Sequence, residues 1–404
     1  MTASLASSAA LRRRAAVDRL GVLIAAITAA AWVFLPFATF KANRIVQGQG
    51  RNVFDALPPA EAALLCVVIG VSLPVLFYRT AVFWRLAVSL LALVTLLVLI
   101  GQTAAFLTPP GNTLARVSPA AGFWLLAFAY LLAIADALTR LRLGPLVRIG
   151  MLVLAALALG LLLLSGDLNG LSILKEYFVR ADAFWREALT HVTLAFGSLV
   201  AAAVVGIPLG ILAFRHRHLR AIVLNVLNAV QTIPSIALFG LLIAPLAWVA
   251  ATVPGAAAIG ISGIGFAPAI LALFIYSLLP VVANTVVGLA GVPAAADDAA
   301  RGMGMTDRQR LFRVQLPLAF PVILTGIRIV LVQNIGLATV AALIGGGGFG
   351  VFVFQGIGQT ALDLVLLGAV PTVLLAFAAA IVLDAFVEMT SVRGSRAGGS
   401  EQSA

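Results

Sequence analysis

Charged residues are scarce in this chain of 404 residues. Only 10% of the residues are Asp, Glu, Lys or Arg, whereas 62% are hydrophobic, and the mean hydropathy is +1.12. A chain with so little charge is too apolar to form one soluble globular core. Lipid is therefore the solvent of most of the chain, and the sequence predicts an all-α, polytopic membrane protein.

Cysteine and lysine are almost absent as well. Cys66 is the only cysteine, which excludes an intrachain disulfide and a cysteine-based metal cluster, and we interpret it as a small packing residue. Only Lys41 and Lys175 among the 26 basic residues are lysines, and the basic residues lie mostly between apolar runs. The net charge of +11 thus indicates membrane topology and not a nucleic-acid partner. The histidines lack nearby ligands for a metal site.

Ten apolar runs approach the length of about 20 residues that a helix needs to cross the hydrocarbon core. We predict about ten transmembrane helices, near residues 20–40, 60–78, 86–107, 121–139, 147–165, 189–214, 221–248, 267–290, 318–343 and 364–388. The first run follows a cluster of arginines but is too long for a cleaved signal peptide. We interpret it as a retained signal anchor.

The distribution of basic residues supports ten spans, because cytoplasmic loops carry an excess of Lys and Arg. With the N-terminus inside and the spans alternating, 19 of the 26 basic residues fall on the cytoplasmic side and 7 outside. One span more or fewer early in the chain would reverse the later loops and spoil this bias. The sequence predicts a multi-pass protein of the bacterial inner membrane with both termini in the cytoplasm.

The two halves of the chain differ in amino-acid composition. Residues 1–166 hold five Leu- and Ala-rich spans, which we expect to form an N-terminal membrane extension that packs laterally. Residues 167–187 are polar and are predicted to be an extracytoplasmic connector. The spans of residues 188–390 contain Gly and Pro, and broken helices occur at membrane depth where they are buried in protein or line a water-filled cavity. We expect the translocation path there, and a disordered cytoplasmic tail at 391–404.

The predicted cytoplasmic loop at 292–321 is the most informative stretch. Two consecutive aspartates stand at the start of an Ala-rich segment, where carboxylates favour a helix N-terminus. Gly302 and Gly304 can end that short helix, and Thr306 can cap the next one. We expect a short helix that protrudes from the membrane and docks its small side chains into a groove of a partner.

This loop resembles the coupling motif of permeases of binding-protein-dependent ATP-binding-cassette (ABC) importers. The motif is an acidic residue, two alanines, three residues, glycine, nine residues, an aliphatic residue, one residue and Leu-Pro. The matching positions here are Asp298, Ala299, Ala300, Gly304, Val314, Leu316 and Pro317. Asp replaces the usual Glu and Val the common Ile, which keeps charge or shape. The alternative is a basic loop of another transporter, but a match at fixed spacing rarely arises by chance.

Four further segments, 231–243, 268–293, 326–350 and 368–386, resemble permeases of the glycine betaine, carnitine and choline osmoprotectant class. The resemblance covers about residues 188–390. It implies a five-helix permease core that pairs with a second permease copy or a paralogue, two cytoplasmic ABC ATPases that dock on the coupling loops, and an extracytoplasmic substrate-binding protein. The first five spans look like the N-terminal extension of a subgroup of these permeases.

The chain has no phosphate-binding loop of its own, because its glycine run, 345–348, is followed by Phe349 and by no basic residue. We interpret this run as a flexible external turn. The chain is therefore expected to be no enzyme and to bind no cofactor, with ATP and Mg²⁺ held by the partner ATPase.

Polar side chains within the second-half spans are the candidates for the translocation path. They are Gln231, Thr232, Ser235, Tyr276, Ser277, Asn284, Gln333, Asn334 and Thr339. Each of them can instead hydrogen-bond a neighbouring helix. Quaternary ammonium groups are usually held by aromatic cages, and Tyr276 alone does not make one, so we expect selectivity to reside mainly in the binding protein.

Two other classes of protein agree less well with the sequence. An ion-driven secondary transporter shows paired ionisable groups near the bilayer midplane and related repeats. A membrane enzyme shows a nucleophile with a base and an orienting group. Neither pattern is present, and we interpret Asp136 and Asp384 as partners of arginines near the membrane surface. Within the ABC class, import of another small polar solute, such as an amino acid or a sulfonate, stays open.

Overall fold

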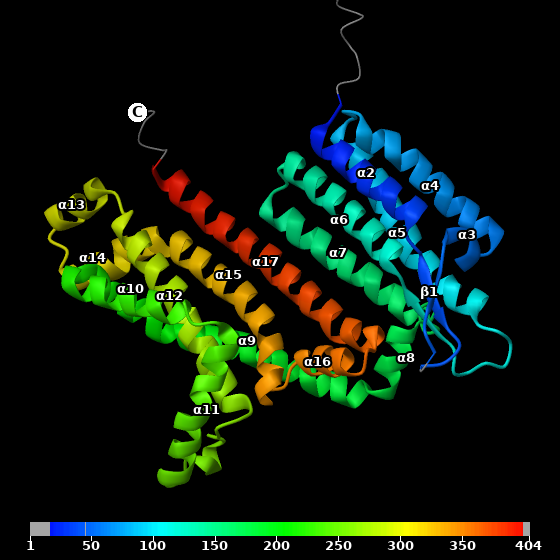
Figure 1. Ribbon diagram of the computed structural model, residues 1–404. Coiled ribbons are helices and arrows are strands. Elements are labelled where there is room, and N and C mark those ends of the chain that lie inside the picture. The colour runs from blue at the N-terminus through cyan, green and yellow to red at the C-terminus, as the bar shows by residue number, and fades with distance from the viewer. Residues whose placement is uncertain (1–16, 45, 399–404) are drawn as a thin grey trace, which may run out of the picture. The chain divides into compact units, whose positions relative to one another are not determined.

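The computed structural model describes residues 17–44 and 46–398, and side chains as far as residue 390. These residues form helices and one small sheet (Figure 1), so the predicted all-α class is confirmed. The chain divides into two compact units. The first comprises the residues up to Leu143 together with Leu154–Phe178, and the second comprises Gly144–Val153 and the residues from Val179 onwards.

The first unit packs its helices around one apolar core. Its elements are α2 (Arg19–Phe34), β1 (Ala38–Lys41), β2 (Gln49–Arg51), α3 (Val53–Ala56), α4 (Pro59–Phe77), α5 (Val82–Leu107), β3 (Arg116–Pro119), α6 (Ala121–Leu141), part of α7 (Pro145–Leu164) and α8 (Ser172–Val179). The strands form an antiparallel sheet in the order β2-β1-β3, in which Thr39 lies opposite Gly50 and Ser118.

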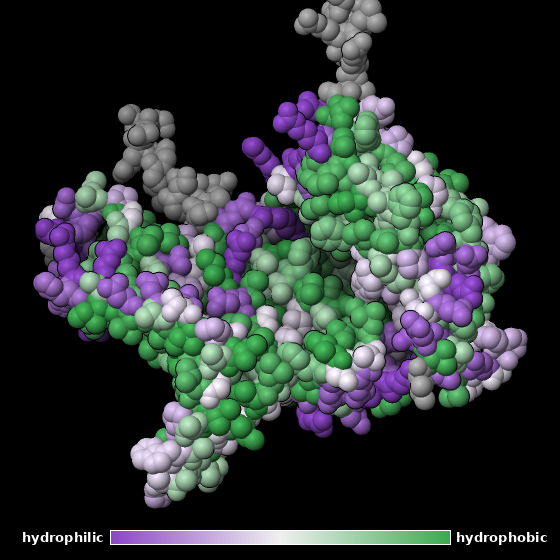
Figure 2. Space-filling view, viewed as in Figure 1, coloured by the Kyte–Doolittle hydropathy of each residue, from purple (hydrophilic) through white to green (hydrophobic). Residues whose placement is uncertain are grey.

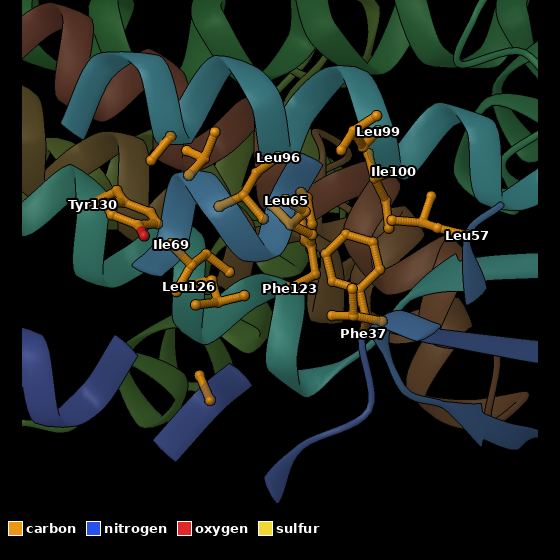
Figure 3. Close-up of a cluster of buried hydrophobic side chains, with 14 of the residues drawn as sticks. Phe37, Leu57, Leu65, Ile69, Leu96, Leu99, Ile100, Phe123, Leu126 and Tyr130 are labelled. Carbon is orange, nitrogen blue, oxygen red and sulfur yellow. The ribbon is translucent and has the colours of Figure 1, made fainter. Parts of the chain in front are cut away.

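Side chains from α4, α5 and α6 point toward one another in this core (Figure 3). Leu65 and Ile69 of α4 meet Leu96 of α5, and all three are fully buried. One polar contact lies among them, between the hydroxyls of Tyr130 and Ser72 at 2.7 Å. Buried hydroxyls need such a partner, so the pair fixes α4 against α6 without leaving a polar atom unsatisfied.

An ionic cluster closes one end of the first unit. Arg85, only 1% exposed, donates to Asp18, and Arg140 donates to Asp18 at 2.8 Å and to Asp136 at 2.9 Å. Burial by itself raises the pKa of Asp18, but the hydrogen bond and charge of Arg85 and the charge of Arg140 outweigh it, so the pKa lies below its usual value. The predicted pairing of Asp136 with arginine is confirmed.

The second unit is built on long helices that cross one another. Its elements are α9 (Ala181–Arg215), α10 (Arg217–Gln231), α11 (Ser235–Thr252), η1 (Ala257–Ile259), α12 (Phe266–Ala290), α13 (Ala294–Gly302), α14 (Asp307–Arg310), η2 (Leu311–Gln315), α15 (Leu316–Val340), η3 (Ala341–Ile344), α16 (Gly350–Gly358) and α17 (Leu362–Gly398). Helices α9 and α12 approach closely because Gly206 faces Val281 and Gly210 faces Thr285. Small residues four apart permit such close packing of membrane helices.

Nine helices of the described residues are long and apolar enough to cross a membrane. Figure 2 shows that apolar side chains dominate much of the visible surface, as lipid-facing helices require. The predicted first span, 20–40, is wrong in length. Helix α2 ends at Phe34 after 16 residues because Pro36 disfavours the helical conformation at Leu35, which is extended.

The predicted continuous span 221–248 is also wrong. The chain forms α10 and α11, which are separated at residues 232–234. Pro234 has no backbone N–H and disfavours the helical conformation at Ile233, so it interrupts the helical hydrogen bonding at this point. Helix α10 begins with arginines and is amphipathic, and only α11 is apolar enough to span.

The predicted disordered tail begins within a helix. Helix α17 continues to Gly398, whereas residues 399–404 lie outside the described residues. Extending a formed helix avoids the cost of nucleation, which explains why a segment of small and polar residues continues α17.

A matched pair of glycines tests the packing of the first unit. At Gly21 of α2 a Cβ atom would lie 1.9 Å from the backbone oxygen of Leu76, whereas at Gly70 of α4 it would meet open space. We expect Gly21→Ala to destabilise the unit by about 1–3 kcal/mol, the usual cost of overpacking. Gly70→Ala should cost nothing, because alanine favours a helix over glycine. Thermal unfolding of the purified chain, followed by tryptophan fluorescence, measures both, and equal melting temperatures would contradict this packing.

Candidate functional site

The short helix α13 forms the body of the predicted coupling loop and ends in a left-handed turn. Gly304 has φ of +77°, its N–H donates to the carbonyl of Arg301 at 3.0 Å, and the N–H of Met305 donates to Ala300 at 3.1 Å. This pair of bonds is the Schellman arrangement, which favours glycine at the left-handed position. Gly304 therefore matters for its backbone conformation, since nothing lies within 4 Å of the space that a side chain would fill.

The second helix of the loop has the cap that the sequence predicts. The hydroxyl of Thr306 accepts from the backbone N–H of Gln309 at 3.3 Å, and the Gln309 side chain accepts from the N–H of Thr306 at 2.9 Å. This reciprocal capping box fixes the first turn of α14. The chain then passes through the π-helical turn η2 into α15.

Asp297 ties the two helices of the loop together. Its carboxylate accepts from Arg310 at 2.7 Å and from Gln315 at 2.8 Å, and Arg310 also donates to Asp307 at 2.6 Å. Arginine and carboxylate form one of the stronger hydrogen-bonded pairs in proteins. The sequence places both aspartates at a helix start but gives no sign of this tie, because Arg310 and Gln315 come into reach only through the turn.

The motif residues divide between an exposed face and an anchored one. Asp298, Ala299 and Gly304 are exposed, whereas Ala300 is 1% exposed and packs inward. The remaining positions are Val314 and Leu316, both half-buried, and Pro317, which is exposed in the first turn of α15. Met303 adds an apolar side chain to the exposed face and is 75% accessible. The loop thus presents small and apolar groups on a fixed scaffold.

A polar pocket of about 360 Å³ lies where α10 ends and α11 begins. Its lining residues are Gln231, Thr232, Ile233, Pro234, Ser235, Tyr276, Gln333 and Leu337. Five of the nine predicted path candidates are therefore brought together here. Gln231 donates to the carbonyl of Tyr276 at 2.9 Å, and the Tyr276 hydroxyl donates to the carbonyl of Ile233. The second bond satisfies the Ile233 carbonyl at the helix break, and the first satisfies the Tyr276 carbonyl of α12, which has no N–H partner at Pro280.

Two other candidates form a fully buried hydrogen-bond network. Asn334 donates to the hydroxyls of Ser198 and Ser277, each at 2.8 Å, and Ser277 donates to the carbonyl of Leu273 at 2.6 Å. The network joins α9, α12 and α15, and its three polar side chains have no exposed surface. This geometry is typical of polar residues that hold membrane helices together.

The last two candidates also lie outside the pocket. Asn284 donates to the carbonyl of Pro280 at 2.8 Å and packs against α15 at Gly326. Thr339 is half-buried near the end of α15, where its carbonyl lies against Gly350. Both positions are parts of close helix contacts.

The glycine run 345–348 is held in place, so the prediction of a flexible turn is wrong. The N–H of Gly348 donates to the carboxylate of Glu187 at 2.7 Å, and the N–H of Phe349 donates to His191 Nδ1 at 3.3 Å. Both acceptors belong to α9, and His191 is fully buried. Sequence reasoning missed these two residues, because each lies well over 100 positions from its partner.

A second ionic cluster lies within the second unit. Asp384 of α17 accepts from Arg328 at 2.6 Å and from Arg148 at 2.8 Å, and Arg148 also pairs with Glu388. The predicted pairing of Asp384 with arginine is confirmed. Within the described residues no group of three or more His, Cys, Asp or Glu side chains is placed to hold a metal ion.

Two neighbouring residues of α15 provide a test of which side chains hold helices together and which line the pocket. Asn334→Leu removes the centre of the buried network and should destabilise the chain by about 0.6 kcal/mol, the average for such bonds between membrane helices. Gln333→Leu, one residue away, faces the pocket and should leave stability unchanged. Chemical unfolding of both variants measures the difference, and a greater loss in Gln333→Leu would refute the assignment.

Comparisons with known proteins identify a family for each half of the chain. Residues 202–392 match the family described as the binding-protein-dependent transport system inner membrane component. Residues 18–174 match the N-terminal domain of the ABC transporter permease YehY. The two matches together reach from the first described helix to α17.

Curated relatives align with the second half of the chain. The osmoprotectant import permease protein OsmW of Salmonella typhimurium is 43% identical over 210 residues, which are 52% of this chain and 91% of that protein. The carnitine transport permease protein OpuCB of Listeria monocytogenes is 37% identical over 46% of this chain and 78% of that protein. The glycine betaine/carnitine/choline transport system permease protein OpuCD of Bacillus subtilis is 35% identical over 53% of this chain and 82% of that protein. The chain therefore belongs to the family of inner-membrane permeases of binding-protein-dependent ABC importers, in the branch of the osmoprotectant permeases.

Proposed function

We propose that this permease forms the translocation path for a quaternary ammonium osmoprotectant of the glycine betaine, choline or carnitine type. Its relatives are named as permeases for osmoprotectants, for carnitine, and for glycine betaine, carnitine and choline. The observation that supports the proposal is the pocket at the α10–α11 break, whose lining combines polar and apolar side chains and contains no carboxylate, histidine, lysine or arginine. A neutral, hydrogen-bonding surface lets a small charged or zwitterionic solute pass without holding it.

We assign the path to the five candidates that line this pocket: Gln231, Thr232, Ser235, Tyr276 and Gln333. Helix packing is assigned to Ser277, Asn284, Asn334 and Thr339, whose bonds lie in helix contacts. The Tyr276 hydroxyl donates to the carbonyl of Ile233. Its single aromatic ring does not form the aromatic cage that usually binds a quaternary ammonium group. Selectivity then resides mainly in the extracytoplasmic binding protein that delivers the solute.

The energy for import comes from ABC ATPases, which hold ATP and Mg²⁺ and dock on the exposed face of α13. Asp298, Ala299 and Met303 form the contact, because their side chains are exposed on the loop. Movement of α13 reaches α15 through Asp297, which binds Gln315 directly before that helix. The coupling loop thus acts as a two-state element that a ligand bound on another subunit shifts.

A second permease copy or a paralogue completes the path. Helix α11 extends away from the other helices of its unit (Figure 1), and only 11% of its apolar window is buried. Leu241 is 60% exposed and Trp248 is 65% exposed on this helix. An apolar helix beside an open polar pocket gives a partner permease the surface with which to enclose the pathway.

The proposed topology places both termini in the cytoplasm of this multi-pass inner-membrane protein. Residues 188–390 form the permease core, 167–187 the extracytoplasmic connector, and 1–166 the membrane extension. The support is the asymmetry of basic residues, of which 19 fall on the inner side.

The coupling role predicts a difference between two glycines of the loop. Gly304→Ala forces a left-handed residue to carry a Cβ, which costs roughly 1–2 kcal/mol, and should lower substrate-stimulated ATPase activity of the assembled importer. Gly302→Ala is the control, since Gly302 ends α13 without a left-handed φ and faces open space. Asp298→Trp should abolish uptake by blocking the docked face. Uptake that persists without any ATPase partner would contradict the permease function itself.

The substrate class is tested by uptake into proteoliposomes that contain the permease, its ATPase and its binding protein. We expect labelled glycine betaine, choline or carnitine to be imported. Gln333→Leu should reduce the rate about five- to tenfold, the value of one hydrogen bond of about 1 kcal/mol. Import of an amino acid or a sulfonate alone would overturn the substrate class and leave the permease function standing.

A further inference from the structure

An apolar groove of about 410 Å³ lies between α2 and α4 of the first unit. Its lining residues are Val22, Ala25, Ala26 and Ala29 of α2, and Leu73, Pro74, Phe77 and Tyr78 of α4 and its end. The α2 residues recur at helical spacing and so share one face of that helix. Alanines form a shallow floor, while the larger side chains of α4 form a wall, and the exposed Ala26 and Phe77 open the groove to the outside.

Two arginines lie at one end of this groove. Arg19 is one helical turn before Val22, on the same face of α2, and Arg79 directly follows Tyr78. The two segments are joined there, because the N–H of Asp18 donates to the carbonyl of Phe77 at 3.2 Å. The positive charges of Arg19 and Arg79 therefore belong to the same mouth of the groove.

The charge at this mouth is available for a ligand. Arg19 and Arg79 are exposed, and neither forms an ion pair with another residue of the described chain. Asp18 directly precedes Arg19 in the chain, but its carboxylate is occupied by Arg85 and Arg140. The acidic group that adjoins Arg19 in the chain is thus already paired, and the mouth keeps a positive charge.

We propose that the groove binds an acyl chain of an anionic phospholipid whose phosphate lies between Arg19 and Arg79. Arginine matches the geometry of a phosphate with paired donors. The face from Val22 to Ala29 runs about 10 Å along α2, which accommodates part of one acyl chain. Basic pockets beside membrane helices favour acidic headgroups, whereas a zwitterionic lipid brings its own positive charge to the same arginines.

Native mass spectrometry of the full chain in detergent tests the headgroup part. Phosphatidylglycerol and phosphatidylcholine with identical acyl chains are added at equal concentration. We expect preferential retention of phosphatidylglycerol, and a loss of about fivefold in that preference for each of Arg19→Gln and Arg79→Gln. Arg142→Gln is the control, because Arg142 is an exposed arginine of the same unit at the end of α6. An unchanged preference in the double variant, or an equal loss in Arg142→Gln, would overturn the proposal.

A second pair of variants tests the groove itself. Ala26→Phe fills the groove with a side chain that points to the lipid and should lower the retention of both lipids. Ala63→Phe adds the same side chain at an exposed position of α4 outside the groove and should lower neither. Equal retention in the two variants would show that lipid is held elsewhere. Both positions are exposed, so the melting temperature should stay unchanged and exclude misfolding.

Discussion

Backbone polar groups at membrane depth need hydrogen-bond partners within the protein. The break between α10 and α11 is tolerated only because this requirement is met there. Pro234 ends the helical bonding, and the carbonyl of Ile233 is left to accept from the hydroxyl of Tyr276. Gln231 in turn donates to the carbonyl of Tyr276. With these groups satisfied, α10 and α11 diverge and a polar pocket opens beside α12 and α15. The pocket therefore follows from one helix break, whose free carbonyl the Tyr276 hydroxyl satisfies.

Helix α15 connects this pocket to the coupling loop. Gln315, directly before the helix, binds Asp297 of the loop, and Gln333 lines the pocket about 25 Å further along the same helix. The network around Asn334 fixes the middle of α15 to α9 and α12. In the mechanism that we propose, a helix held in this way transmits a movement of the loop as a whole, without a chain of separate contacts. On that proposal, the same helix connects the surface on which the ATPase docks to the pocket through which the solute passes.

Local spacing allowed the sequence to predict much of this arrangement. The motif from Asp298 to Pro317 and the cap at Thr306 depend on neighbours in the chain, and the apolar runs located most helices. The break within 221–248 escaped prediction because the apolar face of the amphipathic α10 leads directly into the apolar α11, so that the two helices look like one run in the sequence. Two hydrogen bonds depend on how separate segments fold together. Arg310 donates to Asp297, and the N–H of Gly348 donates to Glu187. Such contacts leave no periodic signal in one sequence.

Accessibility of α15 to water tests most directly whether the pocket belongs to the translocation path. The chain has a single cysteine, so Gln333→Cys and Asn334→Cys can each be made in a Cys66→Ser background. Labelling by a hydrophilic thiol reagent in assembled importers under turnover should modify Gln333→Cys, slow down when solute is present, and leave Asn334→Cys unmodified. Labelling of both cysteines alike, or of Asn334→Cys alone, would contradict the account.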